Sequence, residues 1–272
     1  MSECSHNCSS CNQKCNHPES LLEAPHILSD IKHVIAIVSG KGGVGKSLIT
    51  GLLTSSMNAQ GKRCGVIDAD VTGPSIPQMF GINQRLEGSE TDIIPAESKK
   101  GVKVVSVNLM LQDIKEPVIW RGPIVAGIVG RFWKETVWGN LDYLFIDCPP
   151  GTSDVPLTVF QTIKIDGVII VTSPQDLVSM IVGKAVNMAK KMNIPILGLI
   201  ENMSYLHCPD CGKEIHIYGE SKVNKVAIEY GLDVLGRIPI DPSFAEACDN
   251  GKIEDVEIDF LAAAEKKLLE LE

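Results

Sequence analysis

The sequence has few aromatic residues and no excess of basic residues. Only 5% of its 272 residues are aromatic, and 25 Lys and Arg stand against 34 Asp and Glu, which gives a formal net charge of −9. This acidic balance argues against a dedicated nucleic-acid-binding protein, because no basic excess is present to replace the counterions of nucleic-acid phosphates. The scarcity of aromatic side chains also argues against a surface on which single-stranded bases stack.

Long apolar runs and targeting signals are absent as well. No stretch reaches the length of a membrane-spanning segment. The N-terminus has neither the basic opening nor the apolar centre of a secretory signal. We therefore expect a cytoplasmic protein without a membrane partner. No Pro- or Ser-rich linker divides the chain, so we expect a Cys-rich arm at residues 1–30 followed by one domain at residues 31–272.

From residue 33 onward, apolar runs with β-branched residues alternate with segments of helical length. The pattern predicts helices at 46–60, 123–134, 176–192 and the C-terminus, and strands at 33–39, 63–68, 102–108, 142–147, 166–173, 194–202 and 233–239. Such alternation predicts a three-layer α/β fold, in which helices flank both faces of a mostly parallel sheet. Ligands of these sheets bind at the carboxyl ends of the strands.

One segment fits the phosphate-binding pattern G-x-x-x-x-G-K-[ST]: Gly40, Lys41, Gly42, Gly43, Val44, Gly45, Lys46 and Ser47. It lies between a predicted strand and a predicted helix, so backbone N–H groups and the helix N-terminus can surround the phosphates of ATP. Lys46 is expected to reach the β- and γ-phosphates, and Ser47 to bind Mg²⁺. The fold is therefore predicted to be a P-loop NTPase. Because a loop lysine contributes little packing, we expect Lys46→Ala to abolish hydrolysis and leave the fold intact.

Three aspartates follow predicted strands. Asp68 and Asp70 close the strand at 63–68, where they could position water or a metal ion, or only begin an Asx turn. Asp147 ends the strand at 142–147 and is expected in the outer shell of Mg²⁺. On spacing alone, Lys41 is best interpreted as a solvated loop lysine.

Nine cysteines are unevenly placed along the chain. Four of them crowd the N-terminal arm: Cys4, Cys8, Cys11 and Cys15. Cys208 and Cys211 form one C-x-x-C in a knuckle predicted at residues 207–218. In a reducing compartment such groups indicate metal sites before disulfides. The residues alone leave zinc, an iron–sulfur cluster or no metal open for both groups. One C-x-x-C supplies two ligands, and a two-fold dimer would supply the other two that a tetrahedral sulfur site needs.

Seven segments together resemble the Mrp/ApbC family of iron–sulfur cluster carrier ATPases: SGKGGVGKS, IDADVTGPSIP, WRGP, LDYLFIDCPPGTSD, VTSPQD, IENMSYLHCPDCG and GRIPIDP. This family is a branch of the deviant-Walker-A P-loop NTPases, which include the MinD and ParA types. The resemblance implies a homodimer with ATP between its subunits. It also implies a [4Fe–4S] cluster held by Cys208 and Cys211 of both subunits and passed to apo iron–sulfur client proteins, with slow ATP hydrolysis.

The resemblance also implies roles for single residues. Lys41 is similar to the lysine that reaches the nucleotide across the dimer, which replaces its interpretation as a solvated side chain. Asp70 resembles the aspartate that orients the attacking water, residues 147–152 resemble switch II, and Asn202 resembles the asparagine that recognises adenine. Some family members carry four N-terminal cysteines at wider spacing, so the metal of the arm stays open between a cluster and zinc.

Two other functions share part of this pattern. A partitioning ATPase of the MinD/ParA type requires a basic patch or a basic amphipathic tail, and neither the net charge of −9 nor the terminal segment LAAAEKKLLELE provides one. An electron-transfer ATPase similar to the nitrogenase iron protein would hold its cluster with cysteines on separate loops. The sequence therefore favours the cluster carrier.

Overall fold

The computed structural model describes residues 21–70, 73, 75–89, 91–111, 122–151, 154–175 and 178–272. Several residues named above lie outside these ranges: Cys4, Cys8, Cys11, Cys15, Trp120, Arg121 and Thr152. The site is therefore built below from the remaining residues.

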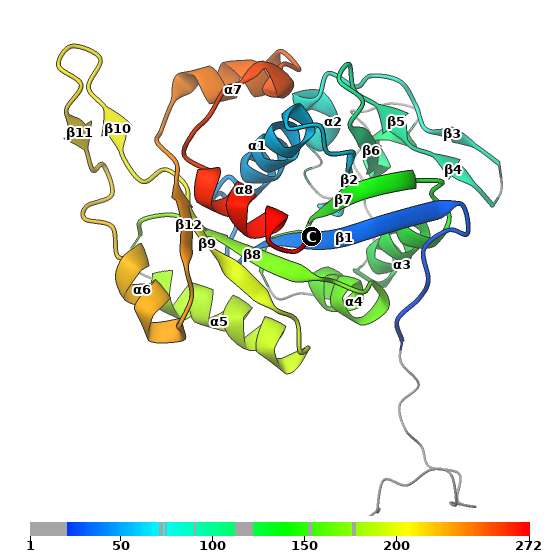
Figure 1. Ribbon diagram of the computed structural model, residues 1–272. Helices are drawn as coiled ribbons and strands as arrows, with labels where there is room; N and C mark the ends of the chain where they lie inside the picture. The colour runs from blue at the N-terminus through cyan, green and yellow to red at the C-terminus, as the bar shows by residue number, and fades with distance from the viewer. Residues whose placement is uncertain are drawn as a thin grey trace, which may run out of the picture.

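The central feature is an eight-stranded sheet with the order β12-β9-β8-β1-β7-β2-β6-β5 (Figure 1). Its strands are β1 (Ser29–Ser39), β2 (Cys64–Asp68), β5 (Ala96–Glu97), β6 (Lys103–Ser106), β7 (Gly139–Asp147), β8 (Gly167–Thr172), β9 (Ile196–Glu201) and β12 (Val234–Arg237). All pairs are parallel except β5 with β6. Two small hairpins stand apart, β3 (Glu87–Gly88) with β4 (Ile93–Ile94) and β10 (Leu206–His207) with β11 (Glu214–Ile215).

Helices cover both faces of this sheet. One face packs against α3 (Gly122–Lys134), α4 (Asp154–Thr162), α5 (Val178–Lys191) and α6 (Val223–Tyr230). The other packs against α1 (Lys46–Ala59), α2 (Ile76–Met79), α7 (Pro242–Asp249) and α8 (Ala262–Leu269). The predicted three-layer α/β fold is confirmed.

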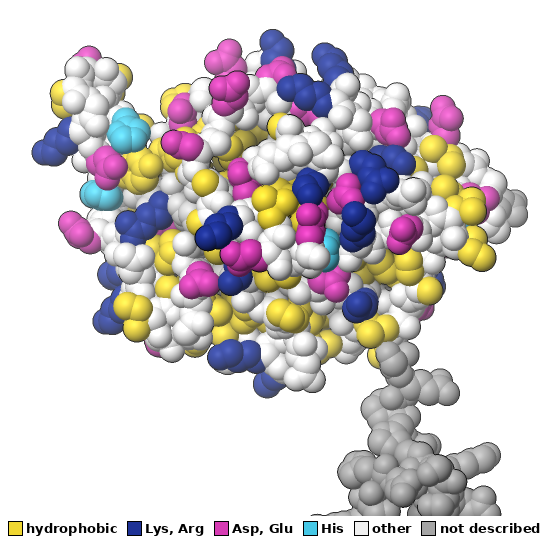
Figure 2. Space-filling model, in the orientation of Figure 1, with side chains coloured by type: hydrophobic (Ala, Val, Ile, Leu, Met, Phe, Trp, Pro, Cys, Tyr) yellow, Lys and Arg dark blue, Asp and Glu magenta, His cyan; other side chains and the backbone are white. Residues whose placement is uncertain are grey.

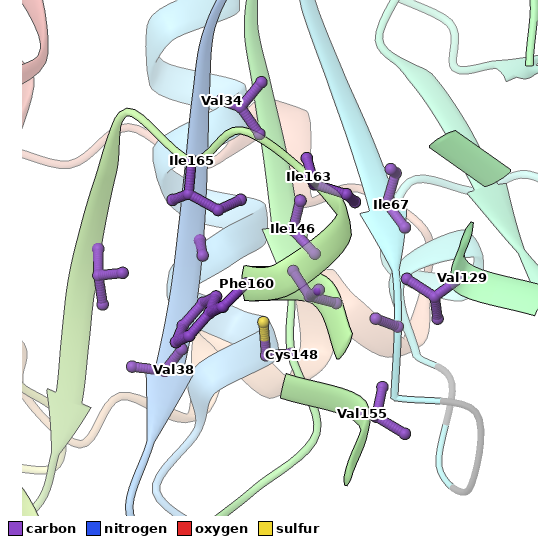
Figure 3. Close-up of a cluster of buried hydrophobic side chains, with 14 of the residues drawn as sticks. Val34, Val38, Ile67, Val129, Ile146, Cys148, Val155, Phe160, Ile163 and Ile165 are labelled. Atoms are coloured by element: carbon purple, nitrogen blue, oxygen red, sulfur yellow. The ribbon is translucent and has the colours of Figure 1, made fainter. Parts of the chain in front are cut away.

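Apolar side chains from the sheet and from α3 and α4 form one of the two cores. Figure 3 shows Val34, Ile146 and Phe160 in this cluster, with the thiol of Cys148 among them. Cys148 is fully buried, and burial raises the pKa of its thiol to about 12. A buried, protonated thiol of this kind is a small core residue rather than a reactive one.

The observed elements differ from the predicted ones where polar residues or prolines obscure the pattern. β1 begins at Ser29 instead of residue 33, because its half-exposed first residues pair with the start of β7. The predicted strand at 102–108 ends at Ser106, and a 3₁₀ turn follows at Val107–Leu109. Helix α4 was not predicted, since Pro156 lies in its first turn, a position where proline is tolerated.

The strand order brings distant parts of the sequence to one edge. β7 lies between β1 and β2, so Asp147 pairs with both Ile37 and Asp68. On the other side of β1, Thr172 at the end of β8 pairs with Glu201 at the end of β9. The loop after β1 therefore faces the carboxyl ends of its neighbours, where ligands of such sheets bind.

The first described residues lie at the opposite edge of the sheet. The N–H of Glu23 donates to the carbonyl of Thr162, at the end of α4, at 2.8 Å. The indole of Trp133 donates to the carbonyl of Glu23, also at 2.8 Å. Among the described residues, no helix combines the length and apolarity needed to cross a bilayer.

Candidate functional site

The phosphate loop (residues 40–47) turns at positions that only glycine occupies easily. Gly43 and Gly45 have φ angles of 76° and 77°, in the left-handed region. A Cβ on Gly45 would lie 2.1 Å from Nδ2 of Asn202, and a Cβ on Gly40 would lie 2.2 Å from the side chain of Ile181. The loop is therefore held by its neighbours in one conformation, directly before α1 begins at Lys46.

Lys46 and Asp147 form a buried ion pair at the start of α1. Their Nζ and Oδ1 atoms are 2.7 Å apart, and the two residues are 6% and 0% exposed. Ser47 donates to Oδ2 of Asp147 at 2.6 Å, and Thr50 donates to Oδ1 at 2.9 Å. Burial alone would lower the pKa of Lys46, but the Asp147 carboxylate outweighs this effect and raises it. Lys46 is thus not the weakly packed loop lysine that the sequence suggested.

Asp68 lies beside this network and is fully buried. Its Oδ2 accepts a hydrogen bond from Ser106 at 3.1 Å, whereas its Oδ1 is buried with no partner among the described residues. Burial, followed by the nearby Asp147 carboxylate, raises the pKa of Asp68 to about 8. The carboxylate of Asp147, together with the Ser47 hydroxyl, provides the hard oxygen ligands that suit a divalent cation such as Mg²⁺.

Two neighbouring cavities lie beside the start of α1. One, of about 300 Å³, is lined by the phosphate loop and by Asp70. The other, of about 350 Å³, is lined by Met203, Phe244 and Cys248 among others. Leu48 lines both cavities, so they are neighbours along one surface. A cavity lined by charged and hydroxyl side chains, next to a more apolar one, fits a ligand with a phosphate end and a flat apolar end.

Asn202 and Lys41 make different contacts from those of Lys46. Asn202 is 2% exposed, lines the second cavity, and donates from Nδ2 to the carbonyl of Val44 at 2.9 Å. Lys41 lines the phosphate cavity, but its Nζ donates to the side chain of Gln175 in the segment after β8. The structure thus brings Lys46, Ser47 and Asp147 together at the loop. The Lys41 amine is not part of this network and contacts Gln175 instead.

The thiol hairpin (Leu206–Ile215) carries Cys208 and Cys211 outside the sheet. Figure 2 shows it projecting from the body of the molecule. Cys211 is exposed and Cys208 half-buried, and the N–H of Gly212 donates to the carbonyl of Cys208 at 2.9 Å. Hydrogen bonds from the N–H groups of Asp210 and Cys211, and from the Cys211 thiol, lower the pKa of Cys208. They favour the thiolate, which is the form that binds metals.

One copy of the described chain supplies only these two thiols to a metal. Across the described ranges, no group of three or more His, Cys, Asp and Glu residues is arranged to hold an ion. The neighbouring histidines contact backbone instead: Nδ1 of His207 lies 3.3 Å from the Gly212 carbonyl, and Nδ1 of His216 lies 3.4 Å from the Ser204 carbonyl. The described hairpin therefore offers two of the four ligands that a tetrahedral thiolate site needs.

Sequence reasoning missed four residues of this region: Thr50, Glu201, Ser204 and Cys248. Thr50 lies one helical turn after Lys46, so helical spacing after the loop could have identified it. Glu201 ends an apolar strand in the same way as Asp147, a signal that the sequence carried. Ser204 and Cys248 become part of the region only through tertiary contacts, and no local pattern marks them.

Comparisons with known proteins agree with this geometry. The model of the NUBPL iron-transfer P-loop NTPase family matches residues 30–269. An iron-sulfur cluster carrier protein of Methanocaldococcus jannaschii is 46% identical over 276 residues, covering 98% of this chain and 95% of the relative. The protein of the same name from Clostridium perfringens is 46% identical over 234 residues, covering 83% of this chain and 82% of the relative.

Solved structures are similar to this chain as well. A nucleotide-binding protein of Archaeoglobus fulgidus, in complex with ADP, has a TM-score of 0.76 and 40% identity, covering 85% of this chain and 90% of that one. The MinD cell division protein of Aquifex aeolicus has a TM-score of 0.59 at 20% identity, covering 88% and 96%, a likeness that shows the fold alone. The predicted resemblance to the carrier ATPases is confirmed, and the chain belongs to the iron-transfer family of P-loop NTPases.

Proposed function

We propose that the protein is an ATP-dependent iron–sulfur cluster carrier that acts as a homodimer and delivers its cluster to apo-proteins. One observation carries the proposal: a phosphate loop with a buried Lys46–Asp147 pair and an exposed two-thiol hairpin belong to one domain. The names of the relatives from M. jannaschii and C. perfringens support the cargo. The ADP complex of the A. fulgidus protein supports the nucleotide.

The phosphate cavity is where we place ATP hydrolysis. Water attacks the γ-phosphorus, the bond to the β–γ bridging oxygen breaks, and ADP and phosphate are released. Lys46 and the loop N–H groups stabilise the charge on the phosphate oxygens, and Asp70 orients the attacking water from the wall of the same cavity. Lys41, whose amine is hydrogen-bonded to Gln175, is proposed to reach the nucleotide of a second copy.

Ser47 and Asp147 are the residues that would hold Mg²⁺, Ser47 directly and Asp147 through water. Their oxygens lie 2.6 Å apart, and Oδ1 of Asp68, which has no partner in the part of the chain that the structure describes, adds a further buried oxygen near Asp147. When bound, the ion supplies positive charge to the β- and γ-phosphate oxygens. Asn202 is proposed to recognise the adenine edge in the neighbouring cavity.

The cluster is proposed to lie between two copies of the thiol hairpin. A [4Fe–4S] cluster takes four thiolates, and one copy offers Cys208 and Cys211. Ile217 and Tyr218, which follow the hairpin, are 54% and 46% exposed, and apolar side chains at this position suit contact with a second copy. Two-fold symmetry then completes the ligand set.

The N-terminal arm is proposed to form a separate metal site. Its cysteines lie outside the described residues, but the chain that follows is anchored at Glu23, at the sheet edge opposite to the phosphate loop. This attachment places the start of the described chain far from the thiol hairpin, as Figure 1 shows. Whether the arm holds a cluster or zinc is a question for metal analysis.

Metal analysis of the wild type and of a Cys208→Ala/Cys211→Ala variant tests the cargo. The full chain is reconstituted without oxygen, and Fe, Zn and acid-labile sulfide are measured per dimer. Loss of about four Fe and four sulfide in the variant is the expected result. Fe that remains in the variant reports the N-terminal arm. Zinc without sulfide in the wild type would overturn the carrier function and leave an ATPase of unknown cargo.

A partitioning ATPase of the MinD/ParA type is the competing function. It predicts ATP-dependent binding to DNA or to liposomes. Absence of both in a pelleting assay would remove it, whereas retention on either surface would favour it over the carrier.

A further inference from the structure

The segment between the second cavity, called the base cavity below, and the thiol hairpin is short and hydrogen-bonded to neighbouring parts of the chain. It runs from Glu201, the last residue of β9, to Leu206, the first residue of β10, and is called the connector below. The N–H of Asn202 donates to the Thr172 carbonyl at 2.8 Å, and the N–H of Ser204 donates to the Ile238 carbonyl at 2.9 Å. Few residues separate Asn202 from Cys208, so we expect a displacement of the Asn202 backbone to move Cys208 as well.

The side chain of Asn202 has two competing partners. In the structure its Nδ2 donates to the Val44 carbonyl and packs on Gly45. The proposed function gives the same amide to an adenine base. Because Nδ2 already lies against Gly45 and the Val44 carbonyl, a base that engages this amide is expected to shift Asn202. The next residue, Met203, has a φ of 57°, a left-handed conformation that is costly for a side chain of this size.

Glu201 places a second constraint on the connector. Its carboxylate is fully buried, accepts the Ser204 hydroxyl at 2.5 Å on Oε2, and leaves Oε1 without a partner in the described part of the chain. A buried carboxylate with so few partners lowers the free energy of unfolding, and a strand can end without such a group. Its effect is to fix Ser204 directly after Asn202 and Met203.

His216 connects this point to the hairpin. Its Nδ1 donates to the Ser204 carbonyl at 3.4 Å, from the residue that directly follows β11. On the other strand of the hairpin, Nδ1 of His207 lies 3.3 Å from the Gly212 carbonyl, and its ring packs edge-on against Tyr205 of the connector with ring centroids 5.0 Å apart. Both histidines therefore contact the connector, but among the described contacts only His216 forms a hydrogen bond to it, at Ser204.

From these contacts we infer that Glu201, Ser204 and His216 are positioning residues that transmit the state of the base cavity to the hairpin thiols. The path runs from the Asn202 amide through Ser204 to His216 and β11. This inference rests on the proposed function, since it takes Asn202 to be the residue that meets the base. It adds to that function a route by which nucleotide binding changes the geometry of Cys208 and Cys211.

Differential alkylation of the full chain, stripped of metal and reduced, tests the inference with two thiol readouts. Iodoacetamide is applied with and without ADP and Mg²⁺, and peptide mass spectrometry gives separate rates for Cys248 and for the Cys208–Cys211 peptide. Cys248 lines the base cavity, so ADP should protect it. In the wild type ADP should also change the rate at Cys208 and Cys211 by about fivefold or more.

Three variants locate the route. His216→Leu and Ser204→Ala should keep the protection of Cys248 and lose the ADP effect at the hairpin. His216→Asn retains a donor near the position of Nδ1 and should restore the effect. His207→Leu is the matched control and should behave like the wild type.

The outcomes distinguish failure of the inference from failure of the proposed function. If Cys248 is protected but the hairpin rates do not respond to ADP, or respond fully in His216→Leu and Ser204→Ala, the inference is wrong and the proposed function stands. If ADP neither binds nor protects Cys248, the proposed nucleotide site is wrong, and the inference is overturned with it.

Discussion

The phosphate loop and the thiol hairpin differ in how deeply their functional side chains are buried and in how many bonds these side chains form. At the loop, Lys46, Thr50 and Asp147 are buried and bonded to one another. At the hairpin, Cys211 is exposed, and the paired strands are only two residues long. On the proposed function, the loop works with groups from its own chain and is preorganised, whereas the hairpin is left open for the thiols of a second copy. Each site should therefore respond differently to mutation.

The largest effect is expected at the buried pair. Lys46→Ala should lower the rate of hydrolysis by at least about 10²–10³-fold, as for loss of a main charge-stabilising donor. It leaves Asp147 as an uncompensated buried charge, so the free energy of unfolding should also fall by about 3–5 kcal/mol. Steady-state ATPase assays and urea unfolding measure the two effects.

A double variant separates charge from packing. Lys46→Met with Asp147→Asn removes both charges and should regain much of the stability without regaining hydrolysis. Lys41→Ala is the control, since this half-exposed lysine should change stability by less than about 0.5 kcal/mol. An unchanged unfolding curve for Lys46→Ala would contradict the burial of the pair.

At the hairpin the expected pattern is reversed. Cys208→Ala/Cys211→Ala should abolish the cluster between subunits and leave both the melting temperature and the affinity for ADP nearly unchanged, because neither thiol supports the core. Cys64→Ala is the matched control: Cys64 is fully buried, so its loss should lower stability by about 1 kcal/mol and leave Fe binding intact. Cluster content after reconstitution and thermal unfolding check both variants. A large fall in melting temperature for the hairpin variant would mean that the hairpin is part of the folded core.

Two glycines allow a direct comparison of the regions. Gly45 and Gly212 have φ angles of 77° and 69°, so Ala at either position costs about 1–2 kcal/mol in backbone strain. Only at Gly45 would the new Cβ also displace Asn202, whereas nothing lies within 4 Å of a Cβ on Gly212. Gly45→Ala should therefore weaken ADP binding by about tenfold or more, which corresponds to about 1.4 kcal/mol. Gly212→Ala should not, and isothermal titration would show equal affinities if the crowding at Gly45 were unimportant.

The smallest effect is expected at Asp142, near the amino end of β7 and away from both sites. Asp142 accepts hydrogen bonds from Arg63 at 3.1 Å and lies 2.8 Å from the amine of Lys32, and these partners hold its pKa well below the usual range. A depressed folded-state pKa gives stability that is present above the unfolded value of about 3.9 and is lost as pH falls through the folded-state pKa. Because Arg63 and Lys32 are about half exposed, Asp142→Asn should cost about 1 kcal/mol at pH 7.

The pH profile provides the check on this estimate. The difference between wild type and Asp142→Asn should shrink below about pH 4, since Asp142 then takes up a proton in the unfolded chain while it is still charged in the folded one. Urea unfolding at pH 7, 5 and 3 measures it. A difference that grows toward low pH would show that the ion pairs are not the source of the stability.

The sequence by itself determined the fold class and the phosphate loop. Apolar β-branched runs at 142–147 and 166–173 alternate with helix-length segments, a periodicity that survives without tertiary information. The loop is readable because its glycines and Lys46 are fixed by local backbone geometry, and Cys208 and Cys211 are readable because two ligands of one knuckle must lie close in sequence.

Only the tertiary structure decided what surrounds these motifs. Lys46 is buried because β7 places Asp147 beside β1, a neighbour about a hundred residues away that no local pattern specifies. The bonds from Glu201 to Ser204 and from Ser204 to His216 likewise depend on how the connector packs between β8 and β12. Motifs that bind through backbone shape consist of consecutive residues and can be identified from the sequence. The burial and positioning of their side chains depend on contacts between separate strands at the carboxyl edge of the sheet.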